Sequence, residues 1–235
     1  MSGKTTAEKH VQARGFPQTS DGRPSLRTAD RGVSPVIGAI LMFALALALL
    51  AILQTTAVPA LNEQAEFQHN QQVHDQLQQL RDAVVSVPGG GGGQSVAVEL
   101  GTQYRPRTLF LNPPAPAGRI ATTAAARIEI DDATTDGEIG DYWNGSTRSV
   151  WTRALSYEAN YNEYRDAPTV FYENTVLFDD NPGANVPRTD QTLIDGNTIT
   201  LVALNGTLSQ STSGTVSVDL RAASSSTRTV AVDNE

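Results

Sequence analysis

The chain has 235 residues, with 17 basic and 25 acidic side chains, a net charge of −8 and no cysteine. The acidic balance argues against nucleic acid as a partner, because phosphate backbones are bound by clusters of Lys and Arg. The absence of cysteine excludes disulfides, thiolate metal sites and a cysteine nucleophile. A hydrophobic core, and contacts with partners, must therefore supply the stability of the fold.

A basic leader precedes a long apolar run near the N-terminus. Residues 1–32 carry six basic and three acidic side chains, a net charge of +3, and residues 33–53 contain no charge at all. As a helix the run is roughly 30 Å long, which matches the hydrocarbon core of a bilayer. We predict a transmembrane helix over 33–53, with the leader in the cytoplasm and the rest outside the cell. The residues after it form a poor signal-peptidase site, so we expect the helix to stay in the mature protein.

The junction between leader and helix carries a motif, which reads Arg31-Gly32-Val33-Ser34-Pro35-Val36-Ile37-Gly38-Ala39-Ile40-Leu41-Met42. This motif resembles the N-terminus of archaeal type IV pilins and pilin-like proteins, and the likeness extends over residues 31–55. It implies that a prepilin peptidase cleaves between Gly32 and Val33, with Arg31, Ser34 and Pro35 among the recognised residues. It also implies pilus-type assembly machinery and other pilin-like subunits as partners, in a homo- or hetero-oligomer.

The apolar run is rich in small side chains, which include Gly38, Ala44, Ala48 and Ala51. Small residues allow helices to approach closely in a bundle or a filament core. An Ala-rich single-pass anchor shows the same composition, and the motif at residues 31–38 favours the pilin-like alternative.

Cleavage after Gly32 would leave 11 arginines against 22 acidic residues, a net charge of −11, because both lysines lie in the leader. Hydrated carboxylates keep a protein soluble in concentrated salt, where screening limits their repulsion. We infer a halophilic archaeal source.

A second helix is predicted over 61–87, beyond a kink at Pro59. Val73, Leu77, Leu80 and Val84 recur at helical spacing and form an apolar stripe on this amphipathic helix. The stripe needs a partner, either the β-domain of the same chain, which we favour, or a neighbouring subunit. Pro88 and the glycines that follow predict a hinge over 88–94. A nucleotide-binding loop is excluded there, because no Lys-Ser/Thr pair follows the glycines.

Residues 95–235 alternate short β-like runs with Pro, Gly, Asn and Asp turns. The predicted strands cover 95–101, 108–112, 127–131, 150–158, 169–178, 198–204, 214–220 and 227–232. The spacing predicts an antiparallel, all-β, sandwich-like extracellular domain. With the long N-terminal helix, the fold class is α+β.

Candidates for chemistry are few, and we predict no catalytic residue, cofactor or metal site. His69 and His74 are five residues apart on a helix, which is too far around it for a shared metal. The acidic stretch 131–141 follows the EF-hand pattern from Asp132, but Trp143 stands where the bidentate Glu is required. A solvated acidic loop is the favoured interpretation, with weak cation binding as the alternative.

Two kinds of surface feature remain. Tyr157, Tyr161 and Tyr164 form either a glycan or protein contact surface or, as we favour, part of the core. Asn144 and Asn205 begin Asn-Gly-Ser and Asn-Gly-Thr sequons and are possible N-glycosylation sites. For Asn205 a hairpin turn is the first interpretation.

The sequence therefore predicts a pilin-like protein of the cell surface whose role is assembly and contact rather than catalysis. It would be a major or minor subunit of a type IV pilus-like filament. The alternative is an uncleaved, single-pass membrane protein whose outer domain binds a glycan or a protein and forms no filament.

Overall fold

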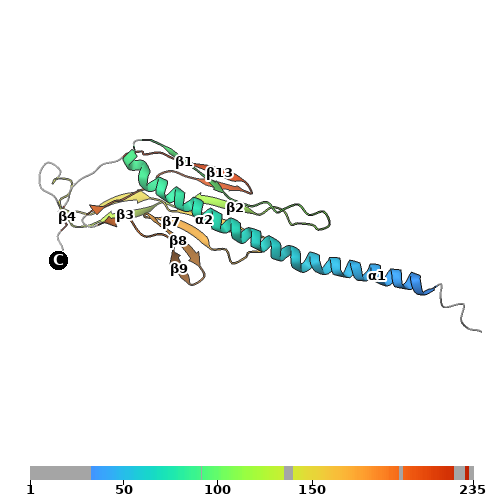
Figure 1. Ribbon diagram of the computed structural model, residues 1–235. Helices are drawn as coiled ribbons and strands as arrows, with labels where there is room; N and C mark the ends of the chain where they lie inside the picture. Colours follow the sequence, from blue (N-terminus) through green and yellow to red (C-terminus); the bar gives the residue numbers. More distant parts are fainter. Residues whose placement is uncertain (1–32, 91, 135–139, 196–197, 225–230, 233–235) are drawn as a thin grey trace, which may run out of the picture. The chain divides into compact units, whose positions relative to one another are not determined.

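The computed structural model describes residues 33–90, 92–134, 140–195, 198–224 and 231–232 (Figure 1). The chain divides into two compact units, Met1–Leu49 and Leu50–Glu235. Within the described residues it is an α+β protein, with a long helical segment followed by antiparallel β-structure. This confirms the predicted fold class, while the sandwich-like arrangement stays a prediction.

The helical segment has three parts, α1 (Val33–Ile52), the π-helical turn η1 (Leu53–Ala57) and α2 (Val58–Gly90). The wider turn lies directly before Pro59, where the sequence predicts a kink. Proline has no N–H to continue the α-helical pattern, and the N–H of Val58 bonds back to the carbonyl of Leu53. The hydroxyl of Thr56 also donates to the carbonyl of Ile52 at 2.7 Å. A π-helical turn therefore accommodates the proline.

The predicted end of the helix at residue 87 is wrong by three residues, since α2 continues to Gly90 and β1 starts at Gln94. Pro88 removes one hydrogen bond to the preceding turn, but it does not prevent the backbone from keeping helical angles for its last residues. The connection between helix and sheet is therefore shorter than the predicted hinge over 88–94.

The main sheet of the described residues has six antiparallel strands in the order β12-β2-β6-β7-β8-β9. Their bounds are β12 (Ser209–Thr212), β2 (Ala117–Thr122), β6 (Leu155–Asn160), β7 (Thr169–Glu173), β8 (Val176–Asn181) and β9 (Ala184–Pro187).

Among the described residues, four two-stranded ribbons accompany this sheet. They pair β1 (Gln94–Glu99) with β13 (Thr215–Leu220), β3 (Ala126–Ile130) with β5 (Arg148–Thr152), β4 (Ala133–Thr134) with β14 (Ala231–Val232), and β10 (Ile194–Asp195) with β11 (Thr198–Ile199).

Five of the eight predicted strands are confirmed in the described residues. Strands are found at 95–101, 127–131 and 214–220, while 150–158 and 169–178 each hold two strands. The predicted strand at 108–112 is wrong, because these residues lie in the loop between β1 and β2. Of 198–204 only β11 is a strand, and of 227–232 residues 227–230 lie outside the described residues. Strand β2, Ala-Gly-Arg-Ile-Ala-Thr, was not predicted because cross-strand pairing, rather than intrinsic propensity, determines it.

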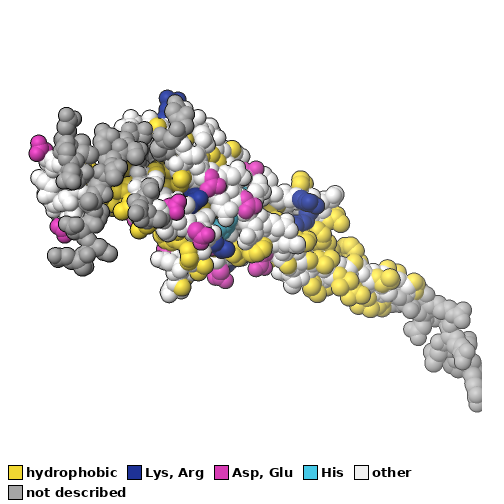
Figure 2. All heavy atoms as spheres, turned by 60° about the vertical axis from the view of Figure 1, so that its left-hand side comes forward, with side chains coloured by type: hydrophobic (Ala, Val, Ile, Leu, Met, Phe, Trp, Pro, Cys, Tyr) yellow, Lys and Arg dark blue, Asp and Glu magenta, His cyan; other side chains and the backbone are white. Residues whose placement is uncertain are grey.

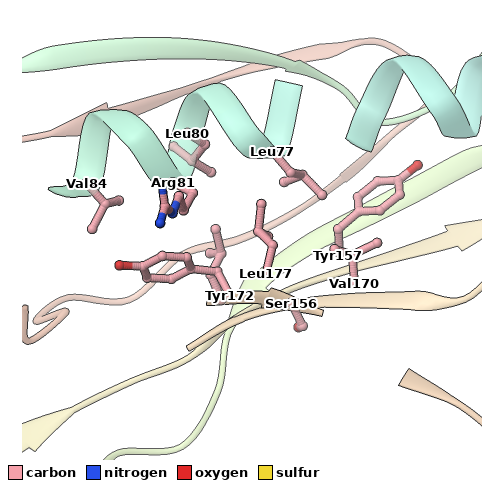
Figure 3. A pocket seen from close by; sticks show the side chains of 10 residues that line it. Leu77, Leu80, Arg81, Val84, Ser156, Tyr157, Val170, Tyr172 and Leu177 are labelled. Atoms are coloured by element: carbon pink, nitrogen blue, oxygen red, sulfur yellow. The ribbon is translucent and has the colours of Figure 1, made fainter. Parts of the chain in front are cut away.

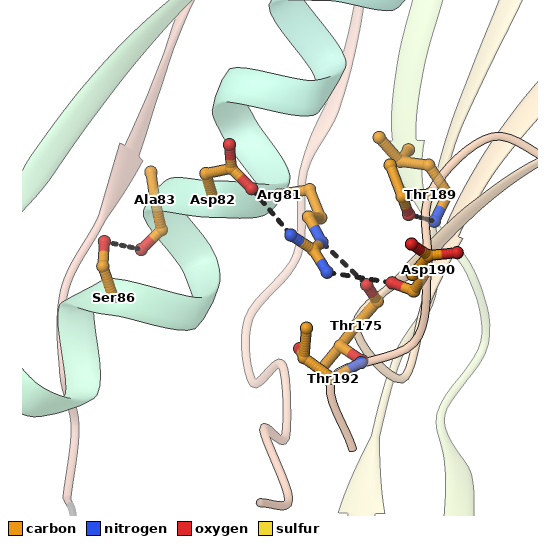
Figure 4. A network of polar contacts seen from close by, with 9 residues as sticks. Arg81, Asp82, Ala83, Ser86, Thr175, Thr189, Asp190 and Thr192 are labelled. Atoms are coloured by element: carbon orange, nitrogen blue, oxygen red, sulfur yellow. Dashed lines mark hydrogen bonds and ion pairs between the residues drawn. The ribbon is translucent and has the colours of Figure 1, made fainter. Parts of the chain in front are cut away.

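The hairpin between β7 and β8 turns through Asn174 and Thr175, whose φ angles are +47° and +72°. Two consecutive positive φ angles define a type I′ turn, which matches the twist of a hairpin. A β-branched residue seldom adopts this conformation, and Thr175 is fully buried. Its carbonyl accepts a hydrogen bond from Nε of Arg81 at 2.8 Å, and its hydroxyl oxygen accepts one from the N–H of Thr192 at 3.0 Å. Figure 4 shows Arg81 reaching from α2 to this turn, which the surrounding contacts hold in place.

The core lies between α2, the six-stranded sheet and the β1–β13 ribbon. In Figure 3 the side chains of Leu77 and Val84 point from the helix toward the sheet. The buried cluster consists of Val73, Leu77, Leu80, Val84, Val98, Leu100, Ile120, Leu155, Tyr157, Val170, Tyr172, Leu177 and Val218. The predicted apolar stripe is thus covered by the β-domain of the same chain, which confirms the favoured interpretation.

Gly118 on β2 marks a close approach of two chain segments. A Cβ at this position would lie 2.1 Å from the carbonyl oxygen of Leu100 and 2.9 Å from the ring of Tyr157. The hydroxyl of Tyr157 donates to that same carbonyl at 3.1 Å, and burial raises the pKa of Tyr157 to about 12. Glycine at 118 therefore allows the segment after β1 to cross the sheet beside a buried tyrosine.

We expect Leu80→Ala to lower the free energy of unfolding by about 2–5 kcal/mol, because it leaves a cavity at a side chain that is only 2% exposed. Chemical denaturation of the full chain in detergent, followed by near-ultraviolet circular dichroism, measures this. Leu61→Ala on the same helix removes the same atoms from a side chain that is 52% exposed, and it should change the free energy by about 0.5 kcal/mol or less. Equal losses for the two variants would contradict the assigned core.

Candidate functional site

Helix α1 exposes apolar side chains on every side. From Val36 to Leu49 its large apolar residues are between 49% and 75% exposed. An apolar surface of this extent is covered by lipid or by other helices, because water would be its least favourable surrounding. This helical segment is the one, among the described residues, that is long and apolar enough to cross a membrane. Helix α1 is therefore the first candidate for a functional surface.

The small residues of α1 divide between two faces. Ala44, Ala48 and Ala51 follow one another at i, i+4 and i+7, so they share one face of the helix and are exposed. Gly38 lies six residues before Ala44 and therefore about 120° around the helix from it. A Cβ at Gly38 would meet no atom within 4 Å, so no contact within the chain requires glycine there. Three of the four predicted packing residues thus form a single slim face.

The predicted processing motif lies at the edge of the described residues. Arg31 and Gly32 fall outside them, while Val33 and Ser34 are the first residues of α1. Pro35 is in the first turn of the helix, where a missing N–H costs no hydrogen bond.

A second candidate site is a row of buried polar side chains on α2, which we call the polar seam. It consists of Asn62, Glu66, His69, Asn70 and His74, each between 0% and 8% exposed. These positions continue the apolar stripe toward the N-terminal end of α2. The helix is therefore attached to the β-domain by polar contacts in its first half and by apolar contacts in its second half.

Glu66 is the best-satisfied member of the polar seam. Its carboxylate is fully buried and accepts hydrogen bonds from the backbone N–H groups of Asn162 (2.9 Å), Glu163 (2.9 Å) and Tyr164 (2.7 Å). It also accepts one from the hydroxyl of Tyr104. Burial, followed by the hydrogen bond to Glu66, raises the pKa of Tyr104. One carboxylate thus fixes both the loop after β6 and the loop between β1 and β2.

His74 and Asp179 form a buried polar contact between α2 and β8. Nε2 of His74 lies 2.9 Å from Oδ1 of Asp179, and Nδ1 lies 2.8 Å from the carbonyl oxygen of Asn70. Both ring nitrogens therefore face oxygen atoms of the chain. Arg188 donates to the other carboxylate oxygen of Asp179, at 2.7 Å from Nε. Each carboxylate oxygen of the buried Asp179 thus has a partner, His74 for one and Arg188 for the other.

His69 has different partners from His74. Its Nδ1 lies 2.6 Å from the hydroxyl of Tyr161, while its Nε2 is buried and has no hydrogen-bond partner among the described residues. Burial lowers the pKa of His69, against the opposing charges of Glu99 and Glu66. The two histidines serve separate contacts, as their spacing predicts. Within the described residues no three His, Asp or Glu side chains form a metal-binding group.

Of the tyrosines at 157, 161 and 164, Tyr157 lies in the core, while Tyr161 and Tyr164 are half-buried. Tyr157 is 1% exposed, Tyr161 contacts His69, and the ring of Tyr164 packs edge-on against Phe67 with centroids 5.5 Å apart. The favoured interpretation as part of the core is confirmed for Tyr157, and for Tyr161 and Tyr164 the choice between packing and a contact surface stays a prediction.

A groove with a volume of about 330 Å³ lies on the face of the main sheet opposite the core. Phe171 and Phe178 stack along it, with ring centroids 5.6 Å apart. The groove is lined by Thr123, Ala126, Thr152, Ala154, Phe171, Glu173, Phe178, Asp180 and Asn185. We call it the sheet groove. Aromatic faces beside carboxylates and an amide suit a polar ligand with an apolar side, such as a sugar or a peptide.

The acidic stretch and the sequons lie on exposed segments. Residues 135–139 fall outside the described residues, while Asp131, Asp132 and Asp141 are exposed. Asn144 is exposed, and its Oδ1 accepts a hydrogen bond from the hydroxyl of Ser146 at 2.6 Å. Asn205 is also exposed, but the predicted hairpin turn there is wrong. Strand β11, before Asn205, pairs with β10, whereas β12, after Asn205, pairs with β2. The two strands that flank Asn205 therefore do not pair with each other.

No protein-family model matches the chain, and no solved structure matches it. Over 182 residues it is 24% identical to a protein of Archaeoglobus fulgidus that is described as an uncharacterized protein. The match covers 77% of this chain but only 30% of that relative. The chain therefore spans less than a third of the length of the relative, and the likeness assigns no function.

The polar seam was not predicted as a unit, although the sequence contains its signal. Extending the apolar stripe backward from Val73 in steps of three and four residues reaches Asn70, Glu66 and Asn62. Polar side chains at positions that helical periodicity places inside indicate buried hydrogen bonds. What the periodicity does not give is the identity of their partners.

We expect Glu66→Gln to lower the free energy of unfolding by about 1–3 kcal/mol, because the amide replaces one acceptor oxygen by a donor that faces backbone N–H groups. Denaturant titration of the full chain, with limited proteolysis at residues 161–164, measures the loss. Glu63→Gln changes an exposed carboxylate one turn away and should leave both readouts unchanged. Identical behaviour of the two variants would contradict the role of Glu66.

We expect His69→Gln to make the stability of the fold less dependent on pH. The folded state lowers the pKa of His69, so below about 6.5 the unfolded chain binds more protons at this residue than the folded chain. This contribution to stability is present above pH 6.5 and is lost as the pH falls. The difference in unfolding free energy between wild type and variant should therefore shrink from pH 7.5 to pH 5. A difference that stays constant with pH would contradict the burial of a neutral His69.

Proposed function

We propose that the chain is a pilin-like protein of the cell surface, inserted in the membrane by α1 and processed by a prepilin peptidase. It would act as a major or minor structural subunit of a type IV pilus-like filament or surface assembly. The observation that carries the proposal is a helix exposed and apolar on all sides, directly behind the motif Arg31-Gly32-Val33-Ser34-Pro35.

In the proposed assembly, α1 moves from one apolar surrounding to another. In the membrane, lipid covers α1, and in a filament the helices of other subunits cover it. The slim face of Ala44, Ala48 and Ala51 supports this step, because small side chains allow close helix packing. The leader, with its net charge of +3, would have to cross the membrane if it stayed attached, which is costly. Cleavage after Gly32 removes that cost.

The β-rich unit would form the outer surface of the assembly. Figure 2 shows hydrophobic side chains along the apolar helix and acidic side chains over the β-rich part of the chain. An acidic surface suits concentrated salt, and a sandwich-like packing of its sheets belongs to this proposal. The proposed role is contact rather than catalysis, since the buried Glu66 accepts hydrogen bonds from the loop after β6 and His74 contacts Asp179, so these side chains have structural partners. The partners are the peptidase, the assembly machinery and other subunits, and no nucleic acid.

A second candidate function is supported by the sheet groove. An uncleaved protein anchored by α1 would display this groove, with its stacked Phe171 and Phe178, to a glycan or a protein outside the cell. Such a protein would not need to form a filament. The two proposals differ in whether residues 1–32 remain on the mature chain.

The N-terminal sequence of the mature protein tests the proposal. In an archaeal host that has a prepilin peptidase, we expect the membrane-extracted protein to start at Val33, and a variant with Arg31→Ala and Gly32→Phe to keep its leader. Gly22→Phe places the same bulky side chain elsewhere in the leader and should be cleaved like the wild type. A start at Met1 or Ser2 in all three proteins would exclude pilin-type processing and favour the anchored, groove-binding alternative.

A further inference from the structure

The loop between β1 and β2, residues 100–116, presents an apolar tip. Leu109 is 74% exposed and Leu111 is 83% exposed, and no other large apolar side chain of the described residues is as exposed as Leu111. Phe110 lies between them and is half-buried. We call residues 109–111 the loop tip. The exposure of two leucine side chains to water is unfavourable, so we expect a partner to cover the loop tip.

The loop tip is held in a defined place. The side-chain amide of Gln54 donates to the carbonyl of Leu111 at 2.9 Å, and its carbonyl oxygen accepts from the N–H of Leu111 at 3.1 Å. Behind the tip, Arg107 donates to Oδ1 of Asn62 at 3.0 Å. The loop thus runs alongside the helical segment from α2 back to η1, as Figure 1 shows. Because these hydrogen bonds hold the loop, Leu109 and Leu111 stay exposed instead of folding back onto the β-domain.

Gln54 gives the loop tip its depth relative to the predicted membrane. It is the first residue after the uncharged run 33–53, and it therefore marks the level at which the hydrocarbon core would end. The backbone N–H and carbonyl of Leu111 both bond to the side chain of Gln54, so the loop tip lies at that same level. Leucine and phenylalanine side chains are favourable at the boundary between headgroups and acyl chains.

The charges around the loop tip agree with this level. From residue 100 to residue 128 the chain contains no Asp or Glu, although the whole chain has 25 of them. Arg105 and Arg107 precede the tip, and Arg105 is exposed. Guanidinium groups bind phosphates well, and lipid headgroups offer phosphates at this depth.

We propose that the loop tip inserts into the headgroup region of the outer leaflet and forms a second membrane contact beside the span, with Arg105 at the lipid phosphates. The inference rests on the proposed membrane insertion of α1. Lipid is favoured over a second copy of the chain because the tip is tied to the end of the span and is flanked by arginines without carboxylates. The second copy is an outcome that the experiment distinguishes.

The chain has no cysteine, so single cysteines can be introduced and spin-labelled in the full-length protein. We would label Leu109→Cys on the loop tip, Leu47→Cys in the predicted span and Val186→Cys, an exposed apolar position on β9. The labelled proteins are placed in nanodiscs of mixed phosphatidylcholine and phosphatidylglycerol, in one preparation with one chain per disc and in a second with two. Electron paramagnetic resonance then compares the access of oxygen, which partitions into lipid, with that of a water-soluble nickel chelate.

For the label at position 47 we expect the accessibility to oxygen to exceed that to the nickel chelate. For the label at 109 both accessibilities should be intermediate, with that to oxygen the higher. For the label at 186 the accessibility to the nickel chelate should be the higher. A Leu109 label that behaves like Val186 while Leu47 lies in lipid would overturn the inference and leave the membrane insertion intact. A Leu47 label in water would overturn both. Protection of the Leu109 label from both reagents only in discs that hold two chains would replace lipid by a second copy and also overturn the inference.

Discussion

The burial of the Glu66 carboxylate is the interaction on which the rest of the β-rich unit depends. An ionised carboxylate without partners is costly to bury, yet this side chain is fully buried. Three consecutive backbone N–H groups after β6 and the hydroxyl of Tyr104 compensate it. Because these donors belong to two different loops, one side chain of α2 fixes both of them. The loop that carries Leu109 is therefore positioned from the helix as well as from the sheet.

The division of α2 into a polar and an apolar half has a consequence for register. Apolar contacts such as those of Leu77 and Leu80 tolerate a shift of the helix by one turn, which is about 5.4 Å. The polar contacts do not tolerate it. After such a shift Glu66 would leave the amides that it accepts from, and Asp179 would lose His74 and keep only Arg188. Unpaired buried carboxylates are penalised strongly, so the polar contacts select one position of α2 while the apolar contacts supply most of its attachment.

Periodicity and composition made the helices and the class of the fold predictable. The apolar run 33–53 and the stripe from Val73 to Val84 are local patterns, and both appear in the structure. Strand β2 and the Asn205 segment were missed because their structure is set by pairing with distant strands, such as β2 with β6. The partners of Glu66 and Gln54 could not be predicted, since they come from residues about 96 and 57 positions away. Helical spacing shows which side chains face inward, but not what they meet.

The positions of the acidic residues relate the N-terminal helical segment to the loop between β1 and β2. Acidic residues are absent from 31–62 and from 100–128, two segments that are far apart in sequence, and also from 196–218. The hydrogen bonds between Gln54 and Leu111 bring these two segments together. A shared lack of carboxylates in segments that meet in space is expected when both face a surrounding that disfavours negative charge. Water at high salt is not such a surrounding, whereas the edge of a bilayer with its phosphates is.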